Sequence, residues 1–344
     1  MLTGGGDCPG LNAVMRAATI KMVSEYGFEV VGARRGWKGM VEGDFVPMDL
    51  QSISGILHKG GTIIGTSRTN PYKEENGVER LKESMEKNGI WAIIGIGGDD
   101  TLGAADKLVK EHGLNIVGVP KTIDNDLSAT DYTFGFDTAV GIATEQIDRL
   151  HSTAESHDRT IVVEVMGRHT GWIAIMSGIA GGADYILIPE VPTTVEDVCE
   201  SLQRRHDERG KNFNIVVASE GAKMLTREGG EQLLTISDKV DAFGNVQLGG
   251  IGEALAGEIE ARTGFETRAT VLGHIQRGGT PSAHDRILST RFGLKAAEMV
   301  KEEKFGFMAA LQGDDIVEAP LADAVGERKM VPMELWDIAK TFFS

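Results

Sequence analysis

Residues 116–126 of this sequence, IVGVPKTIDND, decide the fold that we expect. The first four are apolar and predict a strand buried on both faces, which is typical of parallel sheets. The remainder is a loop with a proline, a lysine and two carboxylates. A second apolar strand, at 91–96, likewise runs into a glycine-rich acidic loop, GGDDT at 97–101. Because ligands of open α/β sheets bind beyond the carboxyl ends of strands, both loops are predicted to border one binding site.

The rest of the chain alternates in the same way between short apolar strands and amphipathic helices. Further strands are expected at 30–33, 161–165, 186–188 and 214–218, and helices from residue 13 onward and at 79–87, 102–111 and 138–150. This alternation predicts an α/β protein with two similar, doubly wound lobes and mostly parallel sheets. Residues 224–250 are polar and interrupted by glycines, so we interpret them as an inserted excursion.

The length of 344 residues favours two domains over one. The first predicted lobe comprises residues 1–135 plus about 275–305, and the second comprises residues 136–274 plus about 306–344. Two residues precede the first glycine-rich loop, although a strand should lead into such a loop. Either the first strand is very short, or a few natural residues come before it.

Composition and charge exclude several classes of protein. Hydrophobic residues make up 41% and charged residues 25%, which is ordinary for a soluble protein. The net charge of −16 argues against nucleic acid or an anionic membrane as the main partner, so phosphate substrates would need a local cluster of cations. Cys8 and Cys199 are the two cysteines, the N-terminus lacks a signal-peptide pattern, and the apolar stretch 171–188 is broken by polar residues and glycines. We therefore predict a cytoplasmic protein without disulfides or membrane spans.

The first glycine-rich loop, TGGGDCPGLN at 3–12, precedes an expected helix. Amides at the positive end of a helix dipole suit a phosphate group. The spacing matches neither G-x-x-x-x-G-K-[ST] nor G-x-G-x-x-G, and a plain strand-to-helix turn would explain the loop taken alone. A second such loop, KGGTIIGTSR at 59–68, ends in a cation, Arg68.

The charged loop itself carries a candidate catalytic set. In a strand or tight loop, Asp124 and Asp126 would point the same way while Asn125 points away. With Lys121 nearby, one face then holds a candidate base, a second carboxylate and a cation, which is what phosphoryl transfer requires. Considered alone, the same residues would also fit an exposed turn.

Taken together, these segments resemble the phosphofructokinase family. The matching stretches lie in the family's order between residues 3 and 286, and they are TGGGDCPGLNAVMR, GGTIIGTSR, GIGGDDT, PKTIDND, DYTFGFDTA, VVEVMGRHTGW, PEVP and RATVLGHIQRGGTPSAHDR. The resemblance implies an enzyme that transfers a phosphoryl group to the 1-hydroxyl of fructose 6-phosphate. It also implies an active site in the cleft between the two lobes.

The resemblance implies a chemical role for the charged loop. Asp124 would take the proton of the sugar hydroxyl, Asp126 would support it, and Lys121 belongs with them as a catalytic residue. Thr122 would contact the reacting end of the sugar. Asp99 would hold Mg²⁺, the expected cofactor, which bridges phosphate oxygens and offsets their charge.

The resemblance also implies which residues bind the two substrates. The sugar phosphate would be contacted by Thr122, Asp124, Met166, Gly167, Arg168, Glu220, His274 and Arg277, and the phosphoryl donor by Gly5, Gly6, Arg68, Asp100 and Lys121. Arg159 and Arg268 would reach the 6-phosphate from a neighbouring subunit, which implies a homo-oligomer, either a dimer or a tetramer. Such arginines would supply the local cations that the net charge requires. Without the motifs, surface ion pairs would explain the arginines, and ordinary solvated or satisfied side chains would explain His274 and Glu220.

The family divides into enzymes that use ATP and enzymes that use pyrophosphate. Asp100 and Lys121 occupy positions where ATP users typically carry glycine, although some ATP users also have the lysine. A carboxylate at position 100 adds bulk and negative charge where a nucleotide would approach, and Lys121 offers a cation to a small, highly charged donor. We therefore predict pyrophosphate as the donor, with reversible formation of fructose 1,6-bisphosphate and phosphate in glycolysis or gluconeogenesis.

Allosteric control is not expected. The positions of charged effector contacts in allosteric bacterial ATP enzymes align with Ile20, Leu50, Gly55 and His151, which cannot rebuild an arginine-lined pocket. Three alternatives stay open, namely an ATP-dependent 6-phosphofructokinase, a kinase of sedoheptulose 7-phosphate and a non-catalytic sugar-phosphate sensor. Loss of Asp99 or Asp124 would favour the sensor, and both residues are present.

Overall fold

A computed structural model describes residues 1–225, 231–233 and 249–343, with the backbone alone for 231–233. The chain forms two compact units. Unit 1 comprises Met1–Thr138 and Arg277–Lys329, and unit 2 comprises Ala139–Gln276 and Met330–Ser344. In the part of the chain that is described, no helix is long and apolar enough to cross a membrane.

Unit 1 is built on a five-stranded sheet with the strand order β1-β4-β5-β12-β13. Its strands are β1 (Leu2–Thr3), β4 (Ile93–Gly97), β5 (Ile116–Pro120), β12 (Phe307–Gln312) and β13 (Asp315–Pro320). The first four strands run parallel, and β13 returns antiparallel to β12 at the edge. A smaller antiparallel pair, β2 (Val31–Ala33) with β3 (Phe45–Pro47), lies in the same unit.

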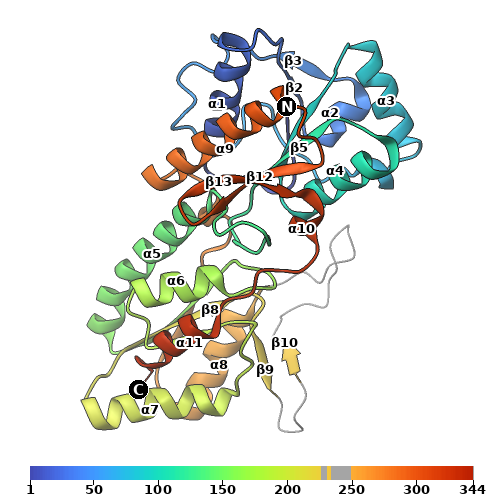
Figure 1. Ribbon diagram of the computed structural model, residues 1–344. Coiled ribbons are helices and arrows are strands. Elements are labelled where there is room, and N and C mark those ends of the chain that lie inside the picture. Colours follow the sequence, from blue (N-terminus) through green and yellow to red (C-terminus); the bar gives the residue numbers. More distant parts are fainter. Residues whose placement is uncertain (226–230, 234–248, 344) are drawn as a thin grey trace. The chain divides into compact units, whose positions relative to one another are not determined.

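The helices of unit 1 contribute many of its buried apolar side chains. They are α1 (Leu11–Ser24), α2 (Trp37–Glu42), α3 (Gly77–Lys87), α4 (Asp99–His112), α9 (Ala283–Lys301) and α10 (Leu321–Val325), with a 3-10 turn η1 at Pro71–Lys73. Helices α1 and α9 pack against each other (Figure 1), and an ion pair between Lys21 and Glu298 joins them. Helix α5 (Phe136–His157) begins in unit 1 and continues into unit 2.

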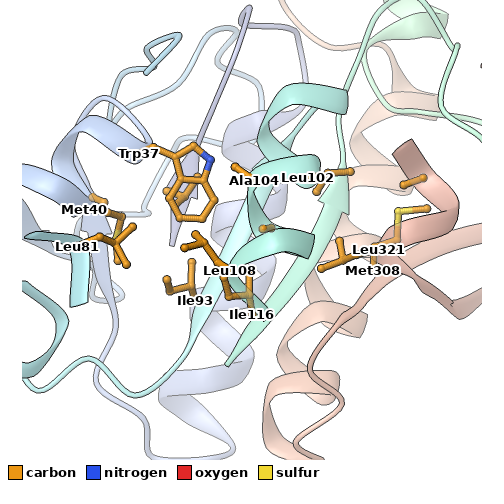
Figure 2. Close-up of a cluster of buried hydrophobic side chains, with 14 of the residues drawn as sticks. Trp37, Met40, Leu81, Ile93, Leu102, Ala104, Leu108, Ile116, Met308 and Leu321 are labelled. Atoms are coloured by element: carbon orange, nitrogen blue, oxygen red, sulfur yellow. The ribbon is translucent and has the colours of Figure 1, made fainter. Parts of the chain in front are cut away.

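A hydrophobic cluster joins the helices of unit 1 to its sheet (Figure 2). Leu102 and Leu108 of α4 lie against strand residues such as Ile93 and Ile116, and all four are at most 1% exposed. Trp37 from α2, Leu81 from α3 and Leu321 from α10 extend the same cluster. Truncating one of these leucines to alanine would cost about 2–5 kcal/mol of unfolding free energy. This packing fixes the strand ends at which the candidate site lies.

Unit 2 has a four-stranded, fully parallel sheet with the order β11-β6-β8-β7. Its strands are β6 (Thr160–Val165), β7 (Tyr185–Leu187), β8 (Asn214–Ser219) and β11 (Thr267–Val271). Its helices are α6 (Trp172–Ala180), α7 (Val195–Arg209), α8 (Ile251–Thr263) and α11 (Met333–Lys340), and a 3-10 turn η2 spans Gly273–Arg277. A short antiparallel pair, β9 (Lys223–Leu225) with β10 (Glu231–Leu233), begins the predicted excursion, most of which lies outside the described residues.

The predicted α/β fold with mostly parallel sheets is confirmed. One predicted boundary was wrong, because residues 306–329 belong to unit 1 and not to the second lobe. The reason is strand pairing: β12 adds to the sheet beside β5, with Met308 opposite Gly118. A Cβ atom at Gly118 would lie 2.5 Å from a methyl carbon of Leu321, so the glycine admits α10 against the sheet.

Candidate active site

The charged loop after β5 is fixed to the loops that follow β1 and β4. The Lys121 backbone N–H donates to the Gly97 carbonyl at 2.9 Å, and Lys121 Nζ donates to the Gly6 carbonyl at 2.5 Å. Lys121 and Asp124 are 5% and 7% exposed, and Asn125 is fully buried. Three strand ends of unit 1 therefore meet at Lys121, as the predicted binding edge of a parallel sheet requires.

The electrostatics of Lys121 reflect its burial. Loss of water lowers its pKa from the ordinary value, and the nearby Arg277 charge also lowers it. The carboxylates of Asp124 and Asp99 act in the opposite direction and raise its pKa. An ammonium in this position is poorly solvated, and it would gain from an anion placed among the same loops.

Of the two backbone forms that were expected at 124–126, a strand or a tight loop, the structure has the tight loop. Asn125 has a φ of 51°, in the left-handed region, so the alternation of a strand does not apply there. Its side-chain Oδ1 accepts from the Thr133 backbone N–H at 3.1 Å, which holds the turn.

Thr122 and Asp126 lie within the same turn. The Asp124 backbone N–H donates to Thr122 Oγ1 at 3.0 Å, and the Thr122 side chain also bonds to the Asp126 carboxylate. Burial raises the pKa of Asp126, and the negative charge of Asp99 raises it further. The negative charge of Asp99 thus disfavours the ionisation of Asp126.

Asp99 and Asp100 open helix α4, which starts three residues earlier than predicted. Both side chains are exposed in the first turn, and the Asp100 N–H donates to Asp99 Oδ1 at 2.9 Å. Among the described residues, no group of three histidine, cysteine or acidic side chains is arranged to hold a metal ion. A pair such as Asp99 and Asp126 nevertheless fits Mg²⁺, which commonly uses one or two carboxylates and takes further oxygens from substrate phosphates and water.

The first glycine-rich loop approaches its neighbours closely. Gly5 has a φ of 77°, its N–H donates to the Ser67 carbonyl at 3.1 Å, and its carbonyl accepts from Thr66 Oγ1 at 2.6 Å. A Cβ atom at Gly6 would lie 2.1 Å from Arg277 Nη1. Arg68, next to Ser67, is exposed. Ten of the predicted residues lie in unit 1, and they are Gly5, Gly6, Arg68, Asp99, Asp100, Lys121, Thr122, Asp124, Asp126 and Arg277.

In unit 2, the loops after β6 and β8 lie against each other because these strands are parallel neighbours. The Arg168 backbone N–H donates to Glu220 Oε1 at 3.2 Å, and the Glu220 N–H donates to the Val165 carbonyl at 2.8 Å. A Cβ atom at Gly221 would lie 1.7 Å from the Arg168 carbonyl oxygen. Met166, Gly167, Arg168 and Glu220 are thus brought together by these two loops.

Arg159 and Arg268 lie at the other end of the same sheet. Arg159 immediately precedes β6, whereas Met166 immediately follows it, so a six-residue strand of roughly 20 Å separates them. Arg159 Nη2 and Arg268 Nη2 both contact Glu266 Oε1, at 2.8 and 2.7 Å. The structure brings these two arginines to each other and not to the Met166 loop of the same subunit.

Comparison with known proteins agrees with the motifs. The phosphofructokinase family model matches residues 1–300. The chain belongs to the phosphofructokinase family. It is 57% identical to the pyrophosphate–fructose 6-phosphate 1-phosphotransferase of Streptomyces coelicolor, an alignment that covers 100% of this chain and 98% of the relative. This confirms the predicted family and the predicted class of enzyme, a phosphotransferase.

Other phosphofructokinases are similar over the same length. The ATP-dependent 6-phosphofructokinase 3 of Streptomyces coelicolor is 51% identical, with 96% of each chain covered. The crystal structure of Pichia pastoris phosphofructokinase matches with a TM-score of 0.80 and 34% identity, over 99% of this chain and 36% of that one. Close relatives of this phosphofructokinase therefore carry names of both donor types.

Sequence reasoning missed two residues that organise the phosphofructokinase loops. Gln276 is fully buried in η2, accepts from the Met166 backbone N–H at 3.3 Å and donates to the Gly273 carbonyl at 3.0 Å. His274 of the same turn is exposed. Lys329 donates to Asn125 Oδ1 at 3.0 Å, although it lies beyond the recognised motifs. Gln276 could have been suspected from its place inside HIQRGG, whereas no pattern marks Lys329.

Proposed function

We propose that this enzyme transfers a phosphoryl group reversibly from pyrophosphate to the 1-hydroxyl of fructose 6-phosphate. The products are fructose 1,6-bisphosphate and phosphate. The observation that carries the proposal is the placement of Lys121, whose buried ammonium contacts the Gly6 carbonyl in the glycine-rich loop. A donor without a nucleoside depends on such cations, because its binding energy must come from its phosphate groups. Relatives 57% identical and named for this reaction add support.

On the acceptor side, Asp124 takes the proton of the 1-hydroxyl as the oxygen attacks the phosphorus atom. The bond to the bridging oxygen of pyrophosphate breaks, and phosphate leaves with the electron pair. Thr122 fixes the Asp124 backbone through its 3.0 Å hydrogen bond and orients the reacting end of the sugar. Positioning and electrostatic stabilisation of this kind supply most of the catalysis in phosphoryl transfer.

The remaining predicted residues bind the phosphates and the sugar. Met166, Gly167, Arg168, Glu220, His274 and Arg277 contact the sugar phosphate, and Gly5, Gly6, Arg68 and Asp100 border the donor. Asp99, with Asp126, would hold Mg²⁺, which when bound would offset negative charge on the phosphoryl oxygens. The raised pKa of Asp126 supports this assignment, because a cation beside the two carboxylates would relieve their repulsion.

ATP is the second candidate donor, since a relative 51% identical is named an ATP-dependent enzyme. Asp100 argues against it. The side chain occupies the exposed first turn of α4 directly after Asp99, so its charge would repel the inner phosphates of a nucleotide approaching the proposed metal site.

We further propose a homo-oligomer without allosteric control. Arg159 and Arg268 lie together at the end of the unit 2 sheet remote from Met166, which suits a role in a neighbouring subunit. Among the positions aligned with effector contacts, His151 Nε2 is engaged with the Gly181 carbonyl at 2.7 Å, and Leu50 is half exposed to solvent. A location in the cytoplasm stays a prediction from the two cysteines.

The test supplies purified protein with fructose 6-phosphate and Mg²⁺, and with pyrophosphate or ATP in separate reactions. Fructose 1,6-bisphosphate is measured by coupled assay. Pyrophosphate is expected to support turnover, and fructose 1,6-bisphosphate with phosphate is expected to drive the reverse reaction. Turnover with ATP and none with pyrophosphate would refute the donor assignment.

A further inference from the structure

Lys329, the last residue of unit 1, is hydrogen-bonded to residues 125–131, which we call the catalytic loop together with Asp124. Its ammonium donates to Asn125 Oδ1 at 3.0 Å, to the Thr130 carbonyl at 2.9 Å and to the Asp131 carbonyl at 2.7 Å. Its backbone N–H donates to the Asp126 carbonyl at 3.0 Å. Arg328, one residue earlier, forms an antiparallel bridge with Leu127. A partly buried lysine with three acceptors is a fixed structural element and not a solvated surface chain.

What Lys329 holds is the strained position between the two carboxylates. Asn125 combines a φ of 51° with complete burial, and left-handed backbone persists outside glycine only when its surroundings enforce it. Asn125 Oδ1 accepts from Lys329 Nζ and from the Thr133 backbone N–H. Rotation of this residue would redirect Asp124 and Asp126 together, because it is the link between them.

The same piece of chain is anchored in unit 2 two residues later. The Val331 backbone N–H donates to Glu190 Oε1 at 3.1 Å. Both Glu190 oxygens also accept from the Gly171 N–H, each at 3.0 Å, and Gly171 closes the loop that begins with Met166. Burial raises the pKa of Glu190, while these amide hydrogen bonds act to lower it. Residues 329–331 thus connect the Asp124–Asp126 loop to the Met166–Gly171 loop through one covalent segment, which we call the strap.

We propose that Lys329 and Glu190 are positioning residues at the two ends of the strap, and that the strap makes the placement of the catalytic loop and of the sugar loop depend on each other. The inference rests on the proposed function of these two loops. Neither residue is among those proposed to contact the substrates. Each acts through a loop that is proposed to contact the substrates, so loosening either end of the strap should disturb the alignment of the reacting groups on which phosphoryl transfer depends.

The experiment compares Lys329→Met, Glu190→Gln and the double variant with wild type, using whichever donor wild type accepts. Each single variant is expected to lower kcat by ~10- to 10²-fold, with KM for fructose 6-phosphate changing less than about threefold. The double variant is expected to be little slower than the slower single variant, because both break the same connection. Lys329→Arg, which keeps the charge and several donors, should recover part of kcat. The control variants Lys340→Met and Glu334→Gln, on the exposed face of α11, should behave as wild type.

A second readout does not need activity. Amide hydrogen exchange in Lys329→Met should accelerate at Thr133, whose N–H bonds to Asn125, and also at Gly171 in the other unit. Glu190→Gln should accelerate exchange at both amides in return. If wild type turns over neither donor, the proposed function fails. The exchange data alone then decide whether the strap couples the two loops.

Three results would overturn the proposal. The first is wild-type kcat in Lys329→Met. The second is a double variant whose loss equals the product of the single losses, since that marks independent sites. The third is exchange that accelerates at Thr133 but not at Gly171 when Lys329 is replaced.

Discussion

Lys121 Nζ donates a 2.5 Å hydrogen bond to the carbonyl oxygen of Gly6, a residue 115 positions earlier in the chain. The bond passes the end of β4, which lies between β1 and β5 in the sheet. It fixes one cation among three loops that follow parallel strands.

Replacing the proposed base should separate binding from turnover. Asp124→Ser is expected to lower kcat by at least ~10²-fold, the lower range for a positioned base, because no other group would take the hydroxyl proton. Binding of fructose 6-phosphate, measured by calorimetry, should persist. Asp148→Ser, on the exposed face of α5, is the matched control. Near-normal turnover would remove Asp124 from the role of base.

The donor assignment predicts the effect of two substitutions. Asp100→Gly combined with Lys121→Gly should shift the ratio of kcat/KM for ATP to that for pyrophosphate by at least ~10-fold, or about 1.4 kcal/mol. The cause is the loss of a repelling carboxylate and of a cation that a small donor needs. Steady-state assays with each donor measure the ratio. No gain with ATP and no loss with pyrophosphate would refute the account of these residues.

Two glycines of the first loop should respond differently to the same change. At Gly4, a new Cβ would lie 2.3 Å from Oγ1 of Thr101, which is 3% exposed and cannot withdraw, so Gly4→Ala should cost ~1–3 kcal/mol of unfolding free energy. At Gly6, the obstacle is the flexible end of Arg277. Gly6→Ala should therefore fold normally but raise KM for the sugar phosphate by ~10-fold through a displaced arginine.

Chemical denaturation and steady-state kinetics check both glycine variants. Gly141→Ala is the control, because nothing lies within 4 Å of a Cβ built there. Equal destabilisation by Gly4→Ala and Gly6→Ala would contradict the distinction between a rigid and a movable neighbour.

Replacing Asp126 by asparagine should raise the stability of the folded protein in a pH-dependent way and lower its activity. Its pKa is raised in the folded state by burial and by Asp99, so the unfolded chain loses this proton at a lower pH, near ~3.9. Stability therefore falls as pH rises from there through the folded pKa. Asp126→Asn carries no such charge, and its melting temperature should exceed that of wild type at pH 7 by more than it does at pH 4. A difference independent of pH would contradict the electrostatic cause.

The proposed role of Arg159 in a neighbouring subunit predicts that two inactive variants regain activity when they are mixed. Asp124→Ser lacks the proposed base and Arg159→Ser lacks a cation for the 6-phosphate, so each variant should be nearly inactive. Each site would draw these two residues from different subunits. Refolding an equal mixture should restore roughly a quarter of wild-type activity, since half of the dimers are hybrids and half of their sites are intact. Co-refolding followed by assay measures the gain. Activity no higher than the sum of the parents would place both residues in one subunit.

The sequence alone predicted the elements that carry the site. Apolar runs such as 93–97 and 116–120 are local signals of buried parallel strands, and the loops after them had to lie at one sheet edge. Lys121, Thr122, Asp124 and Asp126 could therefore be placed together in advance. The start of α4 differed from the predicted residue 102, because Gly98 precedes a first turn that two acidic residues, Asp99 and Asp100, favour.

Tertiary structure decided what depends on partners far away in the chain. The pairing of β12 with β5 moved residues 306–329 into unit 1, since register between distant strands has no local signature. The left-handed turn at Asn125 exists because Thr133 and Lys329 hold it, and Lys329 comes 204 positions later. Sequence determined which chemical groups the loops carry. How those groups are held was determined by the hydrogen bonds of Lys121 to Gly6 and of Lys329 to Asn125, because hydrogen-bond partners are chosen only when the chain has folded.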